Sequence, residues 1–124
     1  MPDQTLVEPI VITIDAASGI GSGFSGRYAK TLGDLTKVYR DEQAFLALAK
    51  ESRDDVAYEV FATPPQEQAG ELIVGTSVVY PGQVGDEFFM TRGHIHQIHG
   101  RAEMYYCLSG HGVMLLESLD GEVN

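Results

Sequence analysis

GHIHQIHGRAEMY, residues 93–105, is the stretch that decides how this chain is interpreted. It places His94, His96 and Glu103 within ten residues. Side chains alternate along a strand, so the two histidines would point to the same face, and Glu103 could return on a neighbouring strand. Two imidazoles and a carboxylate suit a divalent first-row metal and leave coordination positions open. The stretch therefore predicts a metal site on a β framework.

The alternative is that these are ordinary surface histidines in a loop. Three of the four histidines of the chain lie between positions 94 and 99, however, and this clustering in a histidine-poor sequence favours a metal site. His99 falls in the loop between His96 and Glu103, where we expect it to be exposed rather than a ligand. His111 directly follows a predicted turn, and we do not expect it to be a ligand either.

Strand patterns surround this stretch and predict a mainly β domain. Residues 56–62 alternate between apolar and polar side chains and stop at Thr63-Pro64-Pro65. Further strands are expected at 71–80, 87–90, 101–108 and 111–116, the last two forming a hairpin through Ser109-Gly110, with shorter runs at 7–14 and 36–39. Short strands at this spacing, separated by Gly/Pro turns, are typical of a β-sandwich or a β-barrel.

One helix is expected over residues 41–50. Asp41 is a candidate N-cap, an acid follows in the first turn and Lys50 stands in the last. Phe45, Leu48 and Ala49 recur at helical spacing and form one apolar face. We therefore expect residues 1–55 to be an N-terminal arm with short strands and this helix packed on a barrel, and residues 56–124 to be the barrel portion that carries the His motif.

Composition excludes several classes of partner. The formal charge is 8 − 18 = −10, which argues against binding to nucleic acid or to an anionic membrane. No apolar run approaches the roughly 20 residues of a membrane span, and no signal peptide is visible at the N-terminus, so we expect a cytoplasmic protein. Cys107 is the single cysteine, so no intrachain disulfide can form, and we expect this side chain to be buried and inert.

Four short strings carry a family resemblance: PG at 81–82, GDE at 85–87, TRGHIH at 91–96 and EMYYCLSG at 103–110. Together they resemble the first cupin motif and, more narrowly, the cupin-type, metal-dependent phosphoglucose isomerases. The resemblance is densest over residues 75–117 and weaker over 23–39 and 56–61. It implies a cupin jelly-roll or β-barrel fold and interconversion of glucose 6-phosphate and fructose 6-phosphate with one divalent metal ion, Fe most of all, with Mn, Zn or Ni as alternatives.

The resemblance also implies roles for individual residues. His94, His96 and Glu103 match metal ligands, and Glu103 also matches the catalytic base that moves a proton between C1 and C2 of the sugar. Residues matching contacts to the sugar phosphate or the pocket wall are Thr76 or Ser77, Thr91, Gly93, Tyr58 and Tyr105. Core packing remains an equal alternative for the two tyrosines, and Thr91 could be an ordinary strand residue. Arg92 is expected to point outward, away from the site.

The sequence departs from the family pattern after Gly110. The fourth family ligand is a histidine in a second cupin motif, which does not occur before Asn124. We therefore expect a barrel that is incomplete at its C-terminal end. A fragment of a longer isomerase, an intertwined homodimer that exchanges strands, and a non-catalytic module that binds metal or sugar phosphate all remain open, as does another cupin activity such as a dioxygenase or epimerase. Unpaired strand edges favour the homodimer.

Overall fold

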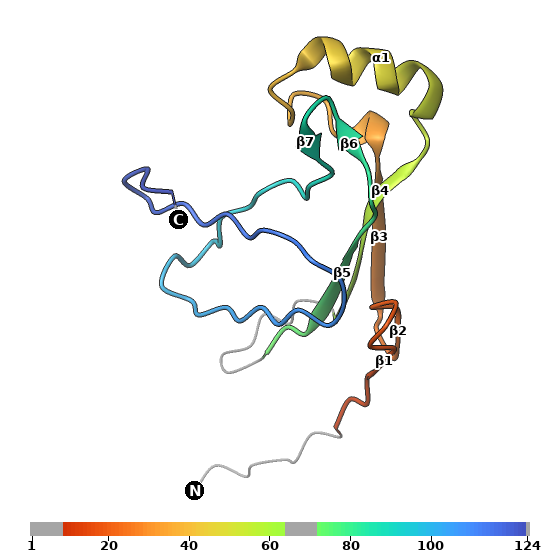
Figure 1. Cartoon of the computed structure of the whole chain (residues 1–124). Helices are drawn as coiled ribbons and strands as arrows, with labels where there is room; N and C mark the ends of the chain where they lie inside the picture. The colour runs from red at the N-terminus through yellow and green to blue at the C-terminus, as the bar shows by residue number, and fades with distance from the viewer. Residues whose placement is uncertain (1–8, 64–71, 124) are drawn as a thin grey trace, which may run out of the picture.

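The structure is a computed structural model that describes residues 9–63 and 72–123, and it is mainly β (Figure 1). The elements in chain order are β1 (Thr13–Ile14), β2 (Gly21–Ser22), β3 (Gly26–Thr31), the 3₁₀ helix η1 (Leu32–Asp34), α1 (Glu42–Ser52), β4 (Val56–Ala62), β5 (Gly75–Val79), β6 (Gln83–Val84) and β7 (Glu87–Phe88). This confirms a mainly β chain with one short α-helix. No helix of the described residues is long and apolar enough to cross a membrane.

The central sheet has three antiparallel strands in the order β3-β4-β5. Its middle strand, β4, has the bounds predicted from sequence, while β5 is shorter than the predicted strand at 71–80, whose first residue lies outside the described residues. In β4 both faces are covered, and Ala57, Tyr58 and Glu59 are all buried. The other two sheets, β1-β2 and β6-β7, are two-stranded ribbons. The described residues thus form part of a β fold rather than a closed barrel.

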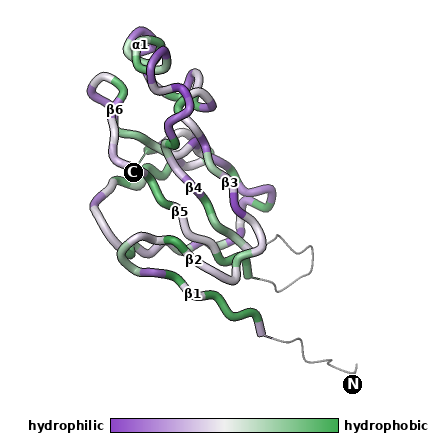
Figure 2. The backbone as a smooth tube through the Cα atoms, turned by 90° about the vertical axis from the view of Figure 1, so that its right-hand side faces the viewer, coloured by the Kyte–Doolittle hydropathy of each residue, from purple (hydrophilic) through white to green (hydrophobic). Residues whose placement is uncertain are grey.

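Helix α1 confirms the predicted helix and extends it to Ser52. Asp41 is its N-cap, and its carboxylate accepts a hydrogen bond from the Ala44 N–H at 2.9 Å, which satisfies one of the free donors of the first turn. Phe45 is the buried residue of the helix and stacks on Tyr39 at a centroid distance of 6.0 Å. Around its turns, α1 alternates between hydrophilic and hydrophobic residues (Figure 2), as an amphipathic helix does.

The hydrophobic core lies where α1, η1 and β6 meet the α1 end of the central sheet (Figure 1). Its buried members are Leu32, Leu35, Tyr39, Phe45, Ala57, Tyr58 and Val84. Residues 36–39, for which a strand was predicted, instead form successive turns after η1, and that prediction is wrong. The Val38 N–H bonds to the Leu35 carbonyl, and Lys37 has a φ of +65°, so the backbone cannot extend there.

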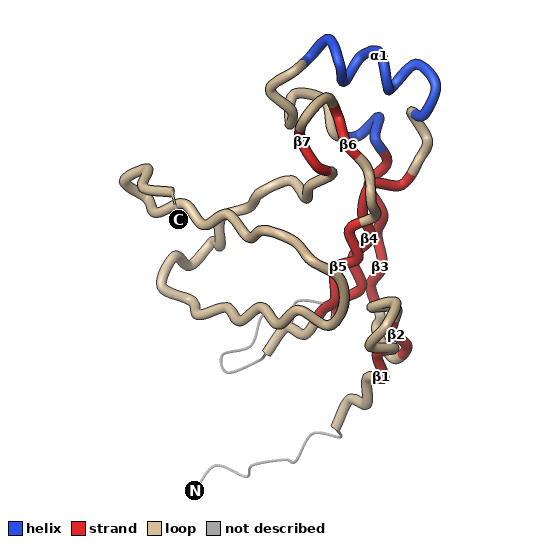
Figure 3. The backbone as a smooth tube through the Cα atoms, viewed as in Figure 1, coloured by secondary structure: helices blue, strands red, loops and turns tan. Residues whose placement is uncertain are grey.

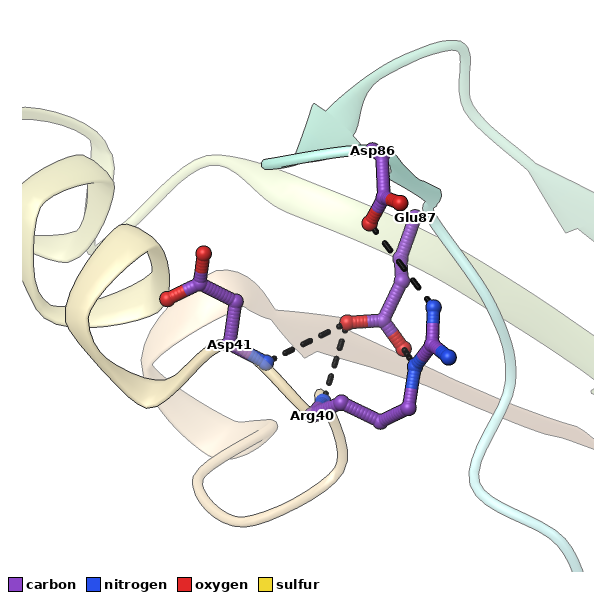
Figure 4. Close-up of polar contacts among 4 residues, drawn as sticks. All are labelled: Arg40, Asp41, Asp86 and Glu87. Carbon is purple, nitrogen blue, oxygen red and sulfur yellow. Dashed lines mark hydrogen bonds and ion pairs between the residues drawn. The ribbon is translucent and has the colours of Figure 1, made fainter.

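The ribbon β6-β7 attaches to the start of α1. Gly85, at a φ of +60°, provides the left-handed residue that its tight turn needs. At the start of β7, Glu87 is nearly buried and accepts hydrogen bonds from the backbone N–H groups of Arg40, at 2.9 Å, and Asp41, at 3.4 Å (Figure 4). The Arg40 guanidinium lies 3.5 Å from the same carboxylate and 3.8 Å from Asp86. Glu87 therefore ties the ribbon to the helix N-terminus.

After β7 the described chain is almost entirely loop (Figure 3), and the predicted hairpin of 101–108 with 111–116 is wrong. The only β-bridge there joins Glu117 and Val123. Gly110 does turn the chain, at a φ of +81°, but the two arms do not pair. Cys107 was expected to be buried and is exposed. The physical reason is that no described strand lies against this segment to take up its backbone hydrogen bonds or cover its side chains.

Two further strand predictions are only partly met. Of the expected strand at 7–14, the structure shows only β1, and residues 7 and 8 lie outside the described part of the chain. Of the expected strand at 87–90, β7 accounts for two residues. Phe89 then donates its N–H to the Gly82 carbonyl at 2.9 Å, which closes the open end of the β6-β7 ribbon. In the described chain, no strand follows between this bond and the His motif.

Candidate metal centre

The structure brings His94, His96 and Glu103 together. The His96 Nε2 atom lies 3.0 Å from one Glu103 carboxylate oxygen, and the His94 Nε2 atom lies 3.9 Å from the other. One potential ligand atom from each residue can be chosen so that all three lie within 4.8 Å of one another. Imidazole nitrogen and carboxylate oxygen are ligands that first-row divalent metals accept. These residues could therefore hold one such ion.

The course of the backbone brings the two imidazole rings and Glu103 close together. Residues 91–96 belong to no strand of the structure, but the imidazole rings of His94 and His96 still lie side by side, with centroids 5.3 Å apart and an interplanar angle of 23°. The chain then bends, and the Arg101 N–H donates to the Ile98 carbonyl at 3.1 Å. This turn brings the chain back so that Glu103 faces the histidines from a loop, rather than from the expected neighbouring strand.

The centre is open to solvent. The exposed fractions of the side chains are 59% for His94, 30% for His96 and 41% for Glu103. The other two histidines, His99 and His111, are exposed and do not belong to this cluster. It is the only such group of potential ligands in the described part of the chain. A metal held here would have coordination positions accessible to a small molecule.

The residues matching phosphate contacts lie in two places. Thr76 is buried on β5 and donates its hydroxyl to the Gly19 carbonyl at 2.7 Å, so this group already has a structural partner. Ser77 follows it on the exposed face of the strand. Thr91 and Gly93 are exposed in the loop that leads to His94. No atom comes within 4 Å of the position that a Cβ would occupy on Gly93, so a ligand has room to approach its backbone.

Two tyrosines matching the pocket wall differ in their surroundings. Tyr58 is buried in the core, and its hydroxyl accepts the backbone N–H of Arg92 at 3.4 Å. Tyr105 is about half exposed. Partial burial first, and then the neighbouring Glu103 carboxylate, raise the pKa of Tyr105 to about 12. Its hydroxyl therefore keeps its proton near neutral pH and can act as a donor beside the metal ligands.

Sequence reasoning missed Tyr28 near this centre and gave Arg92 no role in it. Tyr28, on β3, has a pKa raised by partial burial and then by Tyr58, and it also contributes to the raised pKa of Tyr105. The pairing of β3 with β4 places Tyr28 near Tyr58, and the course of the loop after β7 places Tyr105 near it. No motif in the sequence marks Tyr28. Arg92 was expected to point away from the site. Its exposed side chain donates hydrogen bonds to the carbonyls of Asp34, the last residue of η1, and of Thr36 in the loop that follows.

Comparison with known proteins shows the family to which the chain is similar. Residues 29–124 match the family model described as glucose-6-phosphate isomerase (GPI). The chain is 48% identical over 118 residues to the glucose-6-phosphate isomerase of Sinorhizobium medicae, which covers 95% of this chain and 55% of that protein. It is 44% identical over 114 residues to the enzyme of that name from Thermococcus kodakarensis, covering 92% of this chain and 59% of that protein.

A third relative, the glucose-6-phosphate isomerase of Pyrococcus horikoshii, is 41% identical over 115 residues, which is 93% of this chain and 60% of that protein. The chain therefore spans only 55–60% of the length of these three curated relatives. The family match covers well over half of the chain and includes all three potential metal ligands. The chain belongs to the glucose-6-phosphate isomerase (GPI) family.

Proposed function

We propose that His94, His96 and Glu103 form the catalytic metal centre of an isomerase that interconverts glucose 6-phosphate and fructose 6-phosphate. The observation that carries this proposal is the approach of the three ligand atoms to within 4.8 Å of one another, in a chain of the GPI family. Relatives that cover nearly all of this chain bear the name of that activity. The substrate would be a small anionic sugar, which suits a strongly acidic protein only if local groups receive the phosphate.

The donor set fits one divalent ion, with Fe preferred and Mn, Zn or Ni as alternatives. Two neutral nitrogen donors and one carboxylate suit these metals and leave positions for a ligand. When bound, such an ion would act as a Lewis acid toward the carbonyl and hydroxyl oxygens of the sugar. The residues beside it would orient the substrate: Thr91 and Gly93, which are exposed in the loop before His94, would contact the phosphate, together with the exposed Ser77 on β5.

Glu103 is the candidate base in this mechanism. Isomerisation of an aldose to a ketose moves a hydrogen between C1 and C2, and where it moves as a proton, a carboxylate within reach can carry it. Ligation to a cation lowers the basicity of a carboxylate, so a hydride shift between the two carbons is the rival route. Tyr105, which keeps its proton at neutral pH beside Glu103, would donate a hydrogen bond to the sugar or to that carboxylate.

We further propose that the fold belongs to the cupin superfamily and that the protein is a cytoplasmic homodimer. The described part of residues 56–124 would then be barrel, with the described part of 1–55 as an arm on it. Large apolar side chains of the C-terminal loop support pairing with further strands: Met104 is 88% exposed and Val113 is 86% exposed. Leaving several such apolar side chains exposed to water costs free energy. We therefore propose a second copy of the chain as the partner that covers them.

A non-catalytic module that binds metal or sugar phosphate is the alternative. The openness of the centre favours it, because more than half of the His94 side chain is exposed and isomerases exclude water from their reactive intermediates. The two functions make different demands on Glu103. A binding module needs only its charge and its reach, whereas an isomerase also needs its ability to take up a proton.

The test combines metal content with turnover. The protein is loaded with each metal, its content is measured by elemental analysis, and glucose 6-phosphate formation from fructose 6-phosphate is followed in a coupled assay. We expect about one equivalent of metal per chain and measurable turnover that Glu103→Gln abolishes while part of the metal is retained. Glu51→Gln, an exposed change in α1, is the control. Metal binding without turnover would support the binding module, and a chain that cannot be loaded would refute the metal centre.

A further inference from the structure

The segment that carries the metal ligands has very few polar connections to the rest of the protein. Within the described chain, the hydrogen bonds and ion pairs of residues 91–123 are local to that segment, except for those of one residue, Arg92. Thr91 and Gly93, on either side of Arg92, are exposed. The position of His94, two residues further on, therefore depends strongly on what holds Arg92.

Arg92 contacts two different elements. Its backbone N–H donates to the Tyr58 hydroxyl at 3.4 Å, which ties it to the middle strand of the sheet. Its guanidinium nitrogen Nη2 donates to the Asp34 carbonyl at 3.0 Å and to the Thr36 carbonyl at 3.4 Å. A charged donor makes stronger hydrogen bonds than a neutral one. One residue thus joins the ligand-bearing loop to the sheet, to the last residue of η1 and to the loop that follows η1.

Buried neighbours hold the two acceptor carbonyls, of Asp34 and Thr36, in place. Leu35, which separates the two carbonyl-bearing residues, is fully buried, and Tyr39 is 6% exposed in the same core. Lys37 follows in the left-handed region, at a φ of +65°, a conformation that persists in a non-glycine residue only when its surroundings impose it. Leu35 and Tyr39 therefore anchor this loop in the core, and the loop offers a fixed support to an otherwise exposed segment.

We propose that Arg92 is a positioning residue that sets the geometry of the His94–His96–Glu103 centre. This inference rests on the proposed function only in taking that centre to bind a metal. Without the guanidinium, residues 91–96 would keep a single hydrogen bond to the body of the protein, from the Arg92 N–H to the Tyr58 hydroxyl. The segment would then sample more conformations. The histidines would then be in the binding geometry for a smaller fraction of the time, and the apparent metal affinity would fall in proportion.

The first test measures metal affinity without turnover. Mn²⁺ binding is followed by calorimetry and electron paramagnetic resonance in the unmodified protein and in Arg92→Met, Arg92→Lys and Arg101→Met. We expect Arg92→Met to weaken binding about tenfold, the low end of the loss seen when support behind metal ligands is removed, and Arg92→Lys to recover part of it. Arg101→Met is the control, because it removes the same positive charge two residues from Glu103. Among the described residues, the Arg101 side chain makes no hydrogen bond, and only its backbone N–H donates one, to the Ile98 carbonyl.

The second test needs no metal. In the metal-free protein, Arg92→Met should speed amide hydrogen exchange in a peptide covering 91–97 and leave β4 unchanged, while Arg101→Met should alter neither. Unchanged exchange in 91–97, or unchanged Mn²⁺ affinity, would overturn the positioning role. A raised KM for fructose 6-phosphate with unchanged Mn²⁺ affinity would also overturn it and would make Arg92 a phosphate contact. If the unmodified protein binds no Mn²⁺, the proposed centre itself fails, and the exchange result still shows whether Arg92 holds the loop.

Discussion

Glu87 should stabilise the fold through the backbone of the α1 N-terminus and not through its ion pair. Replacing Glu87 by Ala removes the acceptor for the N–H groups of Arg40 and Asp41 and also the partner of the Arg40 guanidinium (Figure 4). The two contributions can be separated, because Arg40→Met removes the ion pair and leaves both backbone bonds in place. Asp86→Ala removes only the weaker pair, at 3.8 Å.

The magnitudes follow from exposure. Glu87 is 12% exposed and its bond to the Arg40 N–H is 2.9 Å long, so a charge-assisted hydrogen bond of about 2 kcal/mol is at stake. The second bond, at 3.4 Å, adds little. The Arg40 side chain is 80% exposed, and solvent screening limits its ion pair to about 0.5 kcal/mol or less. We therefore expect Glu87→Ala to cost about 2 kcal/mol, Arg40→Met under about 0.5 kcal/mol, and Asp86→Ala almost nothing.

Urea unfolding followed by far-UV circular dichroism measures these differences, since the chain has no tryptophan for fluorescence. Glu87→Gln, which keeps an oxygen acceptor but loses the charge, should fall between the unmodified protein and Glu87→Ala. If Arg40→Met costs as much as Glu87→Ala, the ion pair and not the backbone carries the stabilisation, and the reasoning is wrong. It is equally wrong if Glu87→Ala unfolds at the same urea concentration as the unmodified protein.

Two further predictions concern acids at local structures. Asp41→Ala removes the cap on the Ala44 N–H and should lower the free energy of unfolding by about 1 kcal/mol; in the same urea assay, the exposed Asp54→Ala should change it far less. Hydrogen bonds from the Thr31 backbone and hydroxyl lower the pKa of Asp34 below its ordinary value of 3.8. Its contribution is therefore present above that value and is lost as the pH falls through the folded-state pKa, so Asp34→Asn should flatten the acid end of a melting-temperature profile, and an unchanged profile would contradict this.

Local signals in the sequence account well for the helix and the middle strand. Asp41 and the spacing of Phe45 and Leu48 predicted α1, and they were sufficient because capping and an apolar face act within one element. The alternation over Val56–Ala62 and the following prolines gave the bounds of β4 for the same reason. A strand pattern in the sequence does not produce a strand where no neighbouring strand is available for backbone pairing. Residues 101–116 have the composition of strands, but in the described chain they remain loop, and Cys107 is exposed with them.

For the candidate metal centre, too, the sequence predicted one part and not the other. The spacing of His94, His96 and Glu103 identified the three residues, because their chemistry and their proximity along the chain are both written in the sequence. It could not identify what holds them. The contacts of Arg92 with the carbonyls of Asp34 and Thr36 span more than fifty positions, and no short-range pattern encodes them.

The sequence by itself determined the class of the fold, the helix, the family and the three residues of the candidate metal centre, since each depends on residue types at short spacing. The tertiary structure alone decided that Tyr28 lies near Tyr58 and Tyr105 and that the Thr76 hydroxyl donates a hydrogen bond to the Gly19 carbonyl. It also decided that Arg92 joins the loop with the candidate ligands to the rest of the fold. The physical reason is that hydrogen bonds and burial between distant segments depend on how the whole chain packs, which local preference does not specify.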